Sequence, residues 1–196
     1  MGRIILLGME EIIGPAKVRT LVDQANLSDP VRPGITGNQG SGIPVDEHNP
    51  LQSCLENEYG LAAGRGLALR SGRASFRHLL CEFGKELGLT DLEFRLLPLA
   101  GRLRNGSQAL AGLFNRFTDQ QIKVELEKDH ILWNIKPSYE VDRFHLGSPA
   151  CQFMVGMLQE ALYWVSGGKT FQVEEAHCIS CGSTACSIRI QKDPIQ

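Results

Sequence analysis

The chain has 196 residues, of which 42% are hydrophobic and 21% are charged, and this composition fits a single compact domain spanning 1–196 with a sizeable core. Its 20 basic and 22 acidic side chains leave a net charge of -2, which excludes a general attraction to nucleic acid or to an anionic membrane. No apolar run is long enough to span a bilayer, and the start of the chain lacks the pattern of a signal peptide, so we expect a soluble, cytoplasmic protein.

The first part of the chain has the apolar spacing of helices. Helices are predicted over 3–13 and 15–26, and Pro15 suits the first position of the second one because its missing N–H is not needed there. The segment 28–50 is rich in proline and glycine and is predicted to be a loop, long enough to act as a lid over a ligand. Its glycines do not indicate a phosphate-binding loop, because no strand precedes them.

Helical spacing continues through the middle of the chain. The segment 51–87 is predicted to be one helix, or two helices that meet near Ser71–Gly72. The segment 90–117 is also predicted to be helical, with breaks at Pro98 and at Asn105–Gly106.

The periodicity then changes from helix to strand. The segments 122–126 and 131–135 alternate between apolar and polar residues and are predicted to form a hairpin. A helix over 149–166 follows; it is apolar on most sides and is therefore expected to be buried on most sides. A second hairpin is predicted from the alternation of 171–176 and 186–191. The expected fold is α+β, with helices packed on one face of a four-stranded antiparallel sheet made of two hairpins joined through a buried helix.

The last hairpin carries polar groups on its inward face. Glu175 shares a face with Phe171 and Val173, Cys178 lies just past the end of this strand, and Cys186 opens the next one. An inward carboxylate is costly unless something pairs with it. A carboxylate and thiolates that converge at one end of a hairpin are what a divalent metal would explain.

Cysteines in a reducing compartment are better explained as buried thiols or metal ligands than as disulfides. Cys151 begins the buried helix on the side expected to face the sheet, so it can meet Glu175, Cys178 and Cys186 at one end of the sheet. Three thiolates and a carboxylate suit zinc in a closed tetrahedral site. Such a site would fasten the buried helix to the last hairpin.

Other arrangements of these residues stay open on spacing alone. Cys178 and Cys181 form a C-x-x-C pair that could itself be a metal or redox unit, although the order of elements does not resemble a thioredoxin-like fold. Cys181 lies at the turn and is predicted to be exposed, and His177 could replace one ligand. Plain buried thiols remain an alternative, as they do for Cys54 and Cys81, which lie among apolar helical neighbours and are predicted to be small core residues.

Three segments carry a resemblance to a known family; they read EEAHCISCGSTACSIRI, MEEIIGPAKVRTLVDQANL and ENEYGLAAGRGLALRSGRASF. They resemble the 4-vinyl-reductase domain family, and the first is the most specific. The family includes sensor domains of aromatic-responsive transcription activators, predicted hydrocarbon-binding proteins and a protein linked to bacteriochlorophyll synthesis. The resemblance implies a ligand-binding fold of the kind found in the TRAPP tethering complex and in nitric-oxide signalling. Zinc in the sensor relatives is held by residues that match Cys151, Glu175, Cys178 and Cys186, whereas Cys181 falls where relatives often lack a cysteine.

A closed site with four protein ligands leaves no position for a substrate, so the zinc is expected to be structural and no catalytic residue is predicted. Asp129, His130 and His145 lie in a turn and a connector and are expected to be surface residues. The resemblance implies a cavity between helices and sheet for a hydrophobic or aromatic small molecule. The residues predicted to line it are aromatic or methionine: Phe114, Trp133, Phe153, Met157 and Trp164.

Three functions are compatible with this reading. The first is a non-catalytic sensory or carrier domain, expected to be a homodimer from the resemblance and to pass its output to a separate protein because the chain ends at Gln196. The second is a vinyl reductase of the chlorophyll or bacteriochlorophyll pathway, or a tetrapyrrole-binding accessory protein. The third is an assembly protein. The missing dinucleotide fingerprint weakens the reductase reading.

Overall fold

A computed structural model of the chain describes residues 1–25, 48–118, 120–137 and 149–195. The helices in chain order are α1 (Gly2–Ile13), α2 (Pro15–Gln24), α3 (His48–Tyr59), α4 (Leu61–Phe83), α5 (Leu92–Leu96), α6 (Leu99–Phe117) and α7 (Gln152–Ser166). The strands are β1 (Gln120–Leu126), β2 (His130–Pro137), β3 (Phe171–His177) and β4 (Cys186–Pro194), with a short 3-10 helix η3 (Ile179–Cys181) between the last two. Within the described residues, no helix is both long and apolar enough to cross a membrane.

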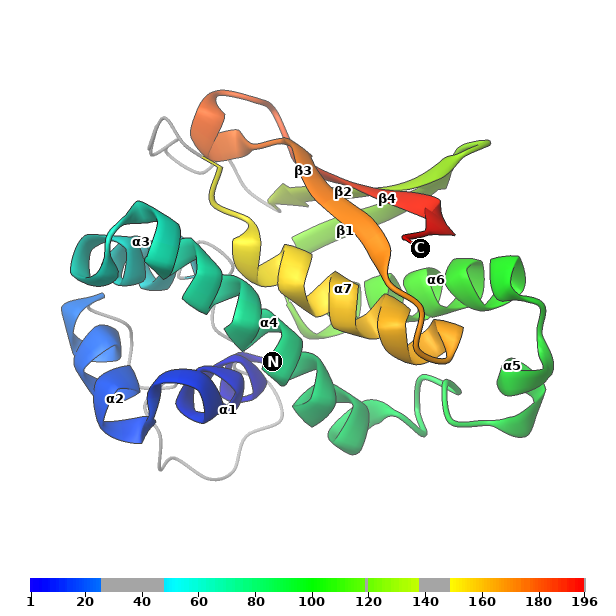
Figure 1. Cartoon of the computed structure of the whole chain (residues 1–196), viewed down its shortest axis with the longest axis horizontal. Coiled ribbons are helices and arrows are strands. Elements are labelled where there is room, and N and C mark those ends of the chain that lie inside the picture. Colours follow the sequence, from blue (N-terminus) through cyan, green and yellow to red (C-terminus); the bar gives the residue numbers. More distant parts are fainter. Residues whose placement is uncertain (26–47, 119, 138–148, 196) are drawn as a thin grey trace.

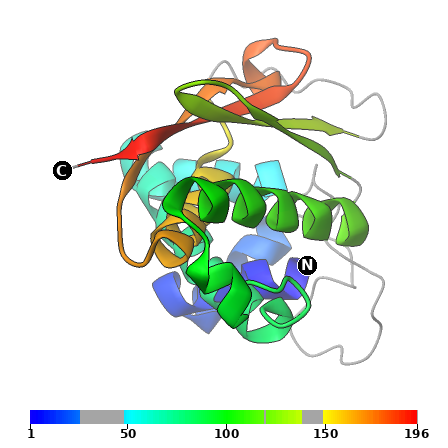
Figure 2. The same cartoon turned by 90° about the vertical axis from the view of Figure 1, so that its right-hand side faces the viewer.

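The strands form one antiparallel sheet in the order β1-β2-β4-β3. The two predicted hairpins are therefore present, and they join edge to edge through β2 and β4, where Trp133 lies opposite Ile188. The helices all lie on one side of this sheet, with α6 and α7 directly beneath it and α1 and α2 farther away (Figures 1 and 2). The predicted α+β class is confirmed, including the buried helix that connects the hairpins.

The apolar side chains form two clusters. The larger lies between the sheet and the helices beneath it, and it includes Trp133, Ile188 and Leu158. The smaller lies among α1, α2, α3 and α4, and it includes Met9 and Leu55. The alternation in the strands and the 3.6-residue spacing in the helices explain which faces enter these clusters.

Helices α4 and α7 cross at backbone contact. A Cβ atom built on Gly72 would lie 2.0 Å from the carbonyl oxygen of Phe153, and one built on Gly156 would lie 1.9 Å from the carbonyl oxygen of Leu69. No side chain fits at either place, so both glycines are needed for this crossing. The predicted joint near Ser71–Gly72 is thus wrong, because these residues lie inside α4 and serve its packing. The helices α3 and α4 meet instead at Gly60, whose φ of 82° is costly for other residues.

Two other expectations from the sequence are also corrected. Pro98 does separate α5 from α6, but the break predicted at Asn105–Gly106 is absent, because Gly106 lies within α6 where a Cβ would meet Val165 at 3.0 Å. Cys81 is exposed and Cys54 is half-buried, so neither is a fully buried core residue. Most of the predicted loop 28–50 lies outside the described residues; its last three residues begin α3. His145 also lies outside them.

Candidate metal centre

Four residues from different elements meet at one end of the sheet. Cys151 is the N-cap residue of α7, Glu175 lies near the end of β3, Cys178 precedes η3, and Cys186 opens β4. One ligand atom from each of these residues lies within 4.8 Å of all the others. The start of α7 and the turn of the β3–β4 hairpin lie side by side at this end (Figures 1 and 2). The structure thus brings together all four residues that the sequence singled out.

Local backbone geometry aims these groups at one point. The β3–β4 register shifts between Glu175 and His177, so the regular alternation ends where the site begins. Beyond the shift, η3 connects β3 to β4. The backbone N–H of Ile179 donates to the Cys186 sulfur at 3.4 Å. The backbone N–H of Cys151 donates to Oε2 of Glu175 at 3.1 Å. These two hydrogen bonds hold the Glu175 carboxylate and the Cys186 sulfur in place without a metal.

The spacing and the unmet hydrogen-bonding capacity both fit a tetrahedral ion. The sulfurs of Cys186 and Cys178 are 4.0 Å apart, and Zn–S bonds of about 2.3 Å place two tetrahedral sulfurs about 3.8 Å apart. The second carboxylate oxygen, Oε1 of Glu175, is buried and has no hydrogen-bond partner among the described residues. A buried carboxylate oxygen without a partner is costly, and a cation would remove that cost.

The four groups perturb one another strongly without a cation. Hydrogen bonds to Cys178 and Cys186, together with burial, raise the pKa of Cys151 well above its usual value. A hydrogen bond to Cys151 lowers the pKa of Cys186, but Cys178 and burial outweigh it and raise that pKa to about 12. Burial raises the pKa of Glu175 to about 7. Hydrogen bonds from the other two thiols lower the pKa of Cys178. The site therefore disfavours four negative charges unless a cation is bound.

The alternative ligands lie outside this group. Cys181 and His177 are both exposed, and neither belongs to the cluster of four. The exposure predicted for Cys181 is confirmed. The C-x-x-C pair also lacks the helix of a thioredoxin-like site, since Cys178 caps and Cys181 ends one 3-10 turn.

Some of the residues predicted to line a ligand cavity lie inside the larger apolar cluster, and the others are partly buried against it. Phe114, Trp133 and Met157 are fully buried in the larger cluster, and the rings of Phe114 and Trp133 meet edge to face at 6.5 Å. Phe153 and Trp164 are half-buried against the same cluster. The indole N–H of Trp133 is buried and has no acceptor among the described residues.

Sequence reasoning missed a small apolar pocket among α1, α3, α4 and α7. Gln52 and Phe153 line it together with Ile5, Met9, Leu51, Leu55 and Ala68. The signal that could have indicated it is Gln52, a polar residue next to the apolar stripe of Leu51 and Leu55 in α3.

Comparison with known proteins finds similarity in structure alone. No family model matches the sequence, and no curated protein matches it. The fold is similar to that of an H-NOX protein from S. oneidensis in the Fe(II)NO ligation state, with a TM-score of 0.62, 13% identity and full coverage of both chains. It is also similar to the H-NOX domain from Shewanella oneidensis in the Fe(II)CO state, with a TM-score of 0.59, 14% identity and 96% coverage of each chain.

A third structure, from work on haem distortion in the H-NOX family, has a TM-score of 0.59 at 14% identity and covers 100% of this chain and 96% of its own. Identities at this level establish the fold and nothing finer. The resemblance to the 4-vinyl-reductase domain family gains no support from the family models. The fold predicted from the periodicity, with helices on one face of a four-stranded sheet, is nevertheless the fold observed.

Proposed function

We propose that this chain is a non-catalytic domain that is stabilised by a structural zinc ion and binds a hydrophobic or aromatic small molecule in a sensory or carrier role. The observation that carries the proposal is the group of Cys151, Glu175, Cys178 and Cys186, whose ligand atoms lie within 4.8 Å of one another. Three thiols and one carboxylate match the donors that zinc prefers. When bound, the ion supplies positive charge and four bonds that hold α7 against the last hairpin.

Four protein ligands complete a tetrahedral zinc site, so a stabilising role follows from the donor count. Cys178 and Cys186 are buried, and the carboxylate of Glu175 is held by the backbone of Cys151. A zinc site of this kind contributes on the order of 10 kcal/mol to folding. We therefore place ligand recognition elsewhere in the domain.

Trp133 supports the small-molecule part of the proposal. Its ring lies in the main core, and its N–H has no acceptor there among the described residues. Leaving such a donor unpaired costs about 1–3 kcal/mol. An acceptor atom on a bound molecule would recover that cost. The solved H-NOX structures, which share this fold, are described with Fe(II)NO and Fe(II)CO ligation.

A tetrapyrrole-binding role is the second candidate, and the haem-containing fold neighbours favour it. The two candidates differ in what they bind. A bound tetrapyrrole gives a strong absorption band in visible light, whereas zinc and a colourless aromatic molecule give none. The homodimer is a part of the proposal that rests on the sequence resemblance alone.

Native mass spectrometry of freshly purified protein, combined with metal analysis, tests the proposal. We expect one zinc per chain, a co-purified small molecule and a dimer mass. Far less than one zinc per chain would refute the zinc site. A visible absorption band would favour the tetrapyrrole role, and a stable protein partner without any small molecule would favour an assembly role.

A further inference from the structure

Among the described residues, Phe153 alone packs against both apolar clusters. It is half-buried and lies in the first turn of α7, two residues after Cys151, a member of the candidate metal centre. The start of α7 therefore holds both a metal ligand and the side chain that joins the two parts of the core.

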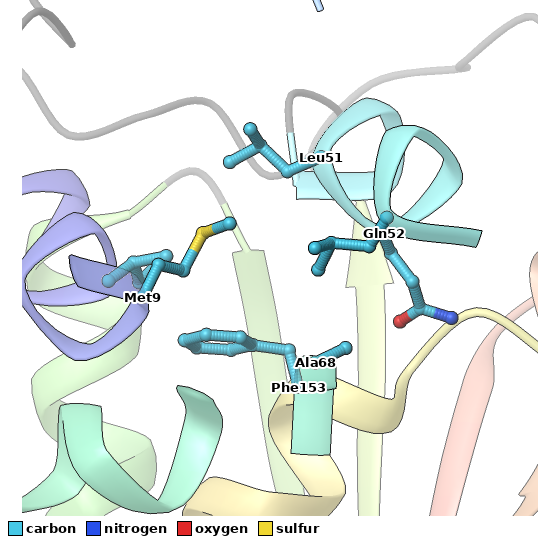
Figure 3. A pocket seen from close by; sticks show the side chains of 7 residues that line it. Met9, Leu51, Gln52, Ala68 and Phe153 are labelled. Carbon is cyan, nitrogen blue, oxygen red and sulfur yellow. The ribbon is translucent and has the colours of Figure 1, made fainter. Parts of the chain in front are cut away.

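The ring of Phe153 borders the small pocket in the helical layer. Met9 from α1 and Leu51 from α3 face each other across this pocket, and Phe153 closes one side (Figure 3). The pocket measures about 20 Å³, which is room for about one water-sized group. This space is too small for a further ligand, but it lets the ring and the side chains around it repack.

The first turn of α7 has few anchors of its own. No side chain caps this helix start, and the backbone N–H of Cys151, its N-cap residue, donates to Oε2 of Glu175 at 3.1 Å. Helix ends without a capping side chain open readily, because their first N–H groups lack partners. A metal ion bound to the sulfur of Cys151 would fix this turn, since the ion also holds ligands from β3 and β4.

The position of Phe153 depends on this turn. The N–H of Val155 donates to the carbonyl oxygen of Cys151 at 3.0 Å, so Phe153 lies within the first helical turn. Its own carbonyl oxygen lies against α4, where a Cβ atom on Gly72 would come within 2.0 Å. Closely packed contacts of this kind transmit a shift rather than absorb it. A change in the turn must therefore move Phe153 relative to α1 and α3.

We propose that Phe153 couples the metal centre to the packing of α1 and α3, so that zinc bound at Cys151 determines how the smaller apolar cluster is arranged. The coupling rests on the proposed zinc site and extends it, because the ion then controls a region that it does not touch. Coupling free energies are reciprocal, so a change in the smaller cluster must also change the affinity for zinc.

Zinc affinity, measured by competition with a coloured chelator, tests the coupling from the smaller cluster. Met9 lines the pocket together with Phe153, and Met9→Ala leaves the four metal ligands intact. We expect this variant to bind zinc about fivefold more weakly, at the low end of the usual coupling between two sites. Leu21→Ala is the matched control, because Leu21 is buried in the same cluster but does not line the pocket. It should leave the affinity unchanged.

A Phe153→Leu background shows whether the ring transmits the effect. Leu keeps an apolar side chain in the first turn of α7 and removes the ring. We expect Phe153→Leu itself to weaken zinc binding, and Met9→Ala to have no further effect in that background. Phe94→Leu is the control for the loss of a half-buried ring and should leave the affinity unchanged. Phe94 lies in α5, at the opposite end of the molecule from the β3–β4 turn (Figure 1).

The unaltered chain supplies a second measurement that needs no variant to fold. With methyl-labelled methionine, the Met9 signal should shift when a chelator removes the zinc. Met157, which is buried in the larger cluster, reports whether the metal-free chain stays folded. A Met9 signal that is the same with and without zinc would refute the coupling.

The remaining outcomes overturn the coupling in distinguishable ways. One zinc per chain with unchanged affinity in Met9→Ala refutes the coupling and leaves the zinc site intact. An equal loss of affinity in Leu21→Ala means that any loss of stability weakens zinc binding, which excludes a specific route. A full effect of Met9→Ala in the Phe153→Leu background excludes Phe153 as the link. Far less than one zinc per unaltered chain refutes the zinc site and the coupling together.

Discussion

The backbone N–H of Cys151 donates to Oε2 of Glu175 at 3.1 Å, and this bond joins the start of α7 to the end of β3. The acceptor that satisfies a free N–H at the helix start is therefore a candidate metal ligand. Its second oxygen, Oε1, is the one that lacks a partner. One carboxylate can thus serve the helix and the ion at the same time, one oxygen for each.

Replacing individual cysteines should distinguish the proposed metal ligands Cys178 and Cys186 from Cys181, which is not one of them. We expect Cys178→Ser and Cys186→Ser to lose bound zinc and to unfold at a markedly lower temperature, because each removes a ligand and leaves the other buried groups without a cation. Cys181→Ser should keep one zinc per chain, since Cys181 is exposed and outside the group. Metal analysis and thermal unfolding measure both effects. Loss of zinc in Cys181→Ser would mean that the C-x-x-C pair is the metal unit.

Glu175→Gln distinguishes the two tasks of this side chain. The amide oxygen of Gln can still accept from the Cys151 N–H, but the negative charge is lost. We expect zinc affinity to fall at least tenfold, as even the loss of groups that only support a metal ligand costs about 10–100-fold. The unfolding free energy of the metal-free protein should not fall at neutral pH and above, because Gln removes a buried negative charge whose pKa burial raises to about 7. Competition with a coloured chelator measures the affinity, and equal affinity in both proteins would exclude Glu175 as a ligand.

Zinc binding should strengthen as the pH rises. Without metal, Cys151 and Cys186 hold their protons at neutral pH, and burial raises the pKa of Glu175 to about 7. Below about pH 7 the ion must displace a proton from all three groups, and above it from the two thiols alone. A plot of log affinity against pH should therefore rise more steeply below pH 7 than above it. A flat plot would contradict these ligands.

The metal-free protein should show the opposite trend at high pH. The folded pKa of Cys186, about 12, lies above its ordinary value of 9.0. A raised folded pKa gives stability that is complete below the unfolded value and is lost as the pH climbs to the folded one. Unfolding of chelator-treated protein should become easier between pH 9 and about 12. Denaturant titrations at several pH values measure this, and stability that stays constant over the range would contradict it.

The sequence allowed good prediction of the features that depend on local periodicity. The alternation around Glu175 and Cys186 placed both on the inward face, and the apolar sides of α7 required that Cys151 begin a buried helix. These elements adjoin in the chain, so their ends could be matched without knowing the rest of the fold. The geometry of the candidate site therefore follows largely from patterns within 149–191.

The features that failed depend on partners distant in sequence. Gly72 lowers local helix propensity, and its role appears only once the carbonyl of Phe153 is placed against it. The Gln52 pocket requires α1, α3, α4 and α7 together. The ligand-lining role assigned to Phe114 and Trp133 stays a prediction. Their rings meet edge to face, and composition alone cannot show whether such rings also face a ligand.

The α4–α7 crossing yields a prediction about stability. A Cβ at Gly72 would lie 2.0 Å from the Phe153 carbonyl oxygen, far inside contact distance, and the atom it meets belongs to a backbone that cannot rotate away. We expect Gly72→Ala to lower the unfolding free energy by about 3 kcal/mol, at the upper end of the usual cost of overpacking. Urea unfolding measures the loss.

Gly66→Ala is the matched control in the same helix. Gly66 is exposed in α4, and a Cβ there meets nothing within 4 Å. Alanine is a better helix former than glycine, so this variant should gain about 0.5–1 kcal/mol. If Gly72→Ala lowers the unfolding free energy and Gly66→Ala raises it, the close contact between α4 and α7 outweighs helix propensity at Gly72. Stabilisation by both would mean that α4 and α7 lie farther apart than described.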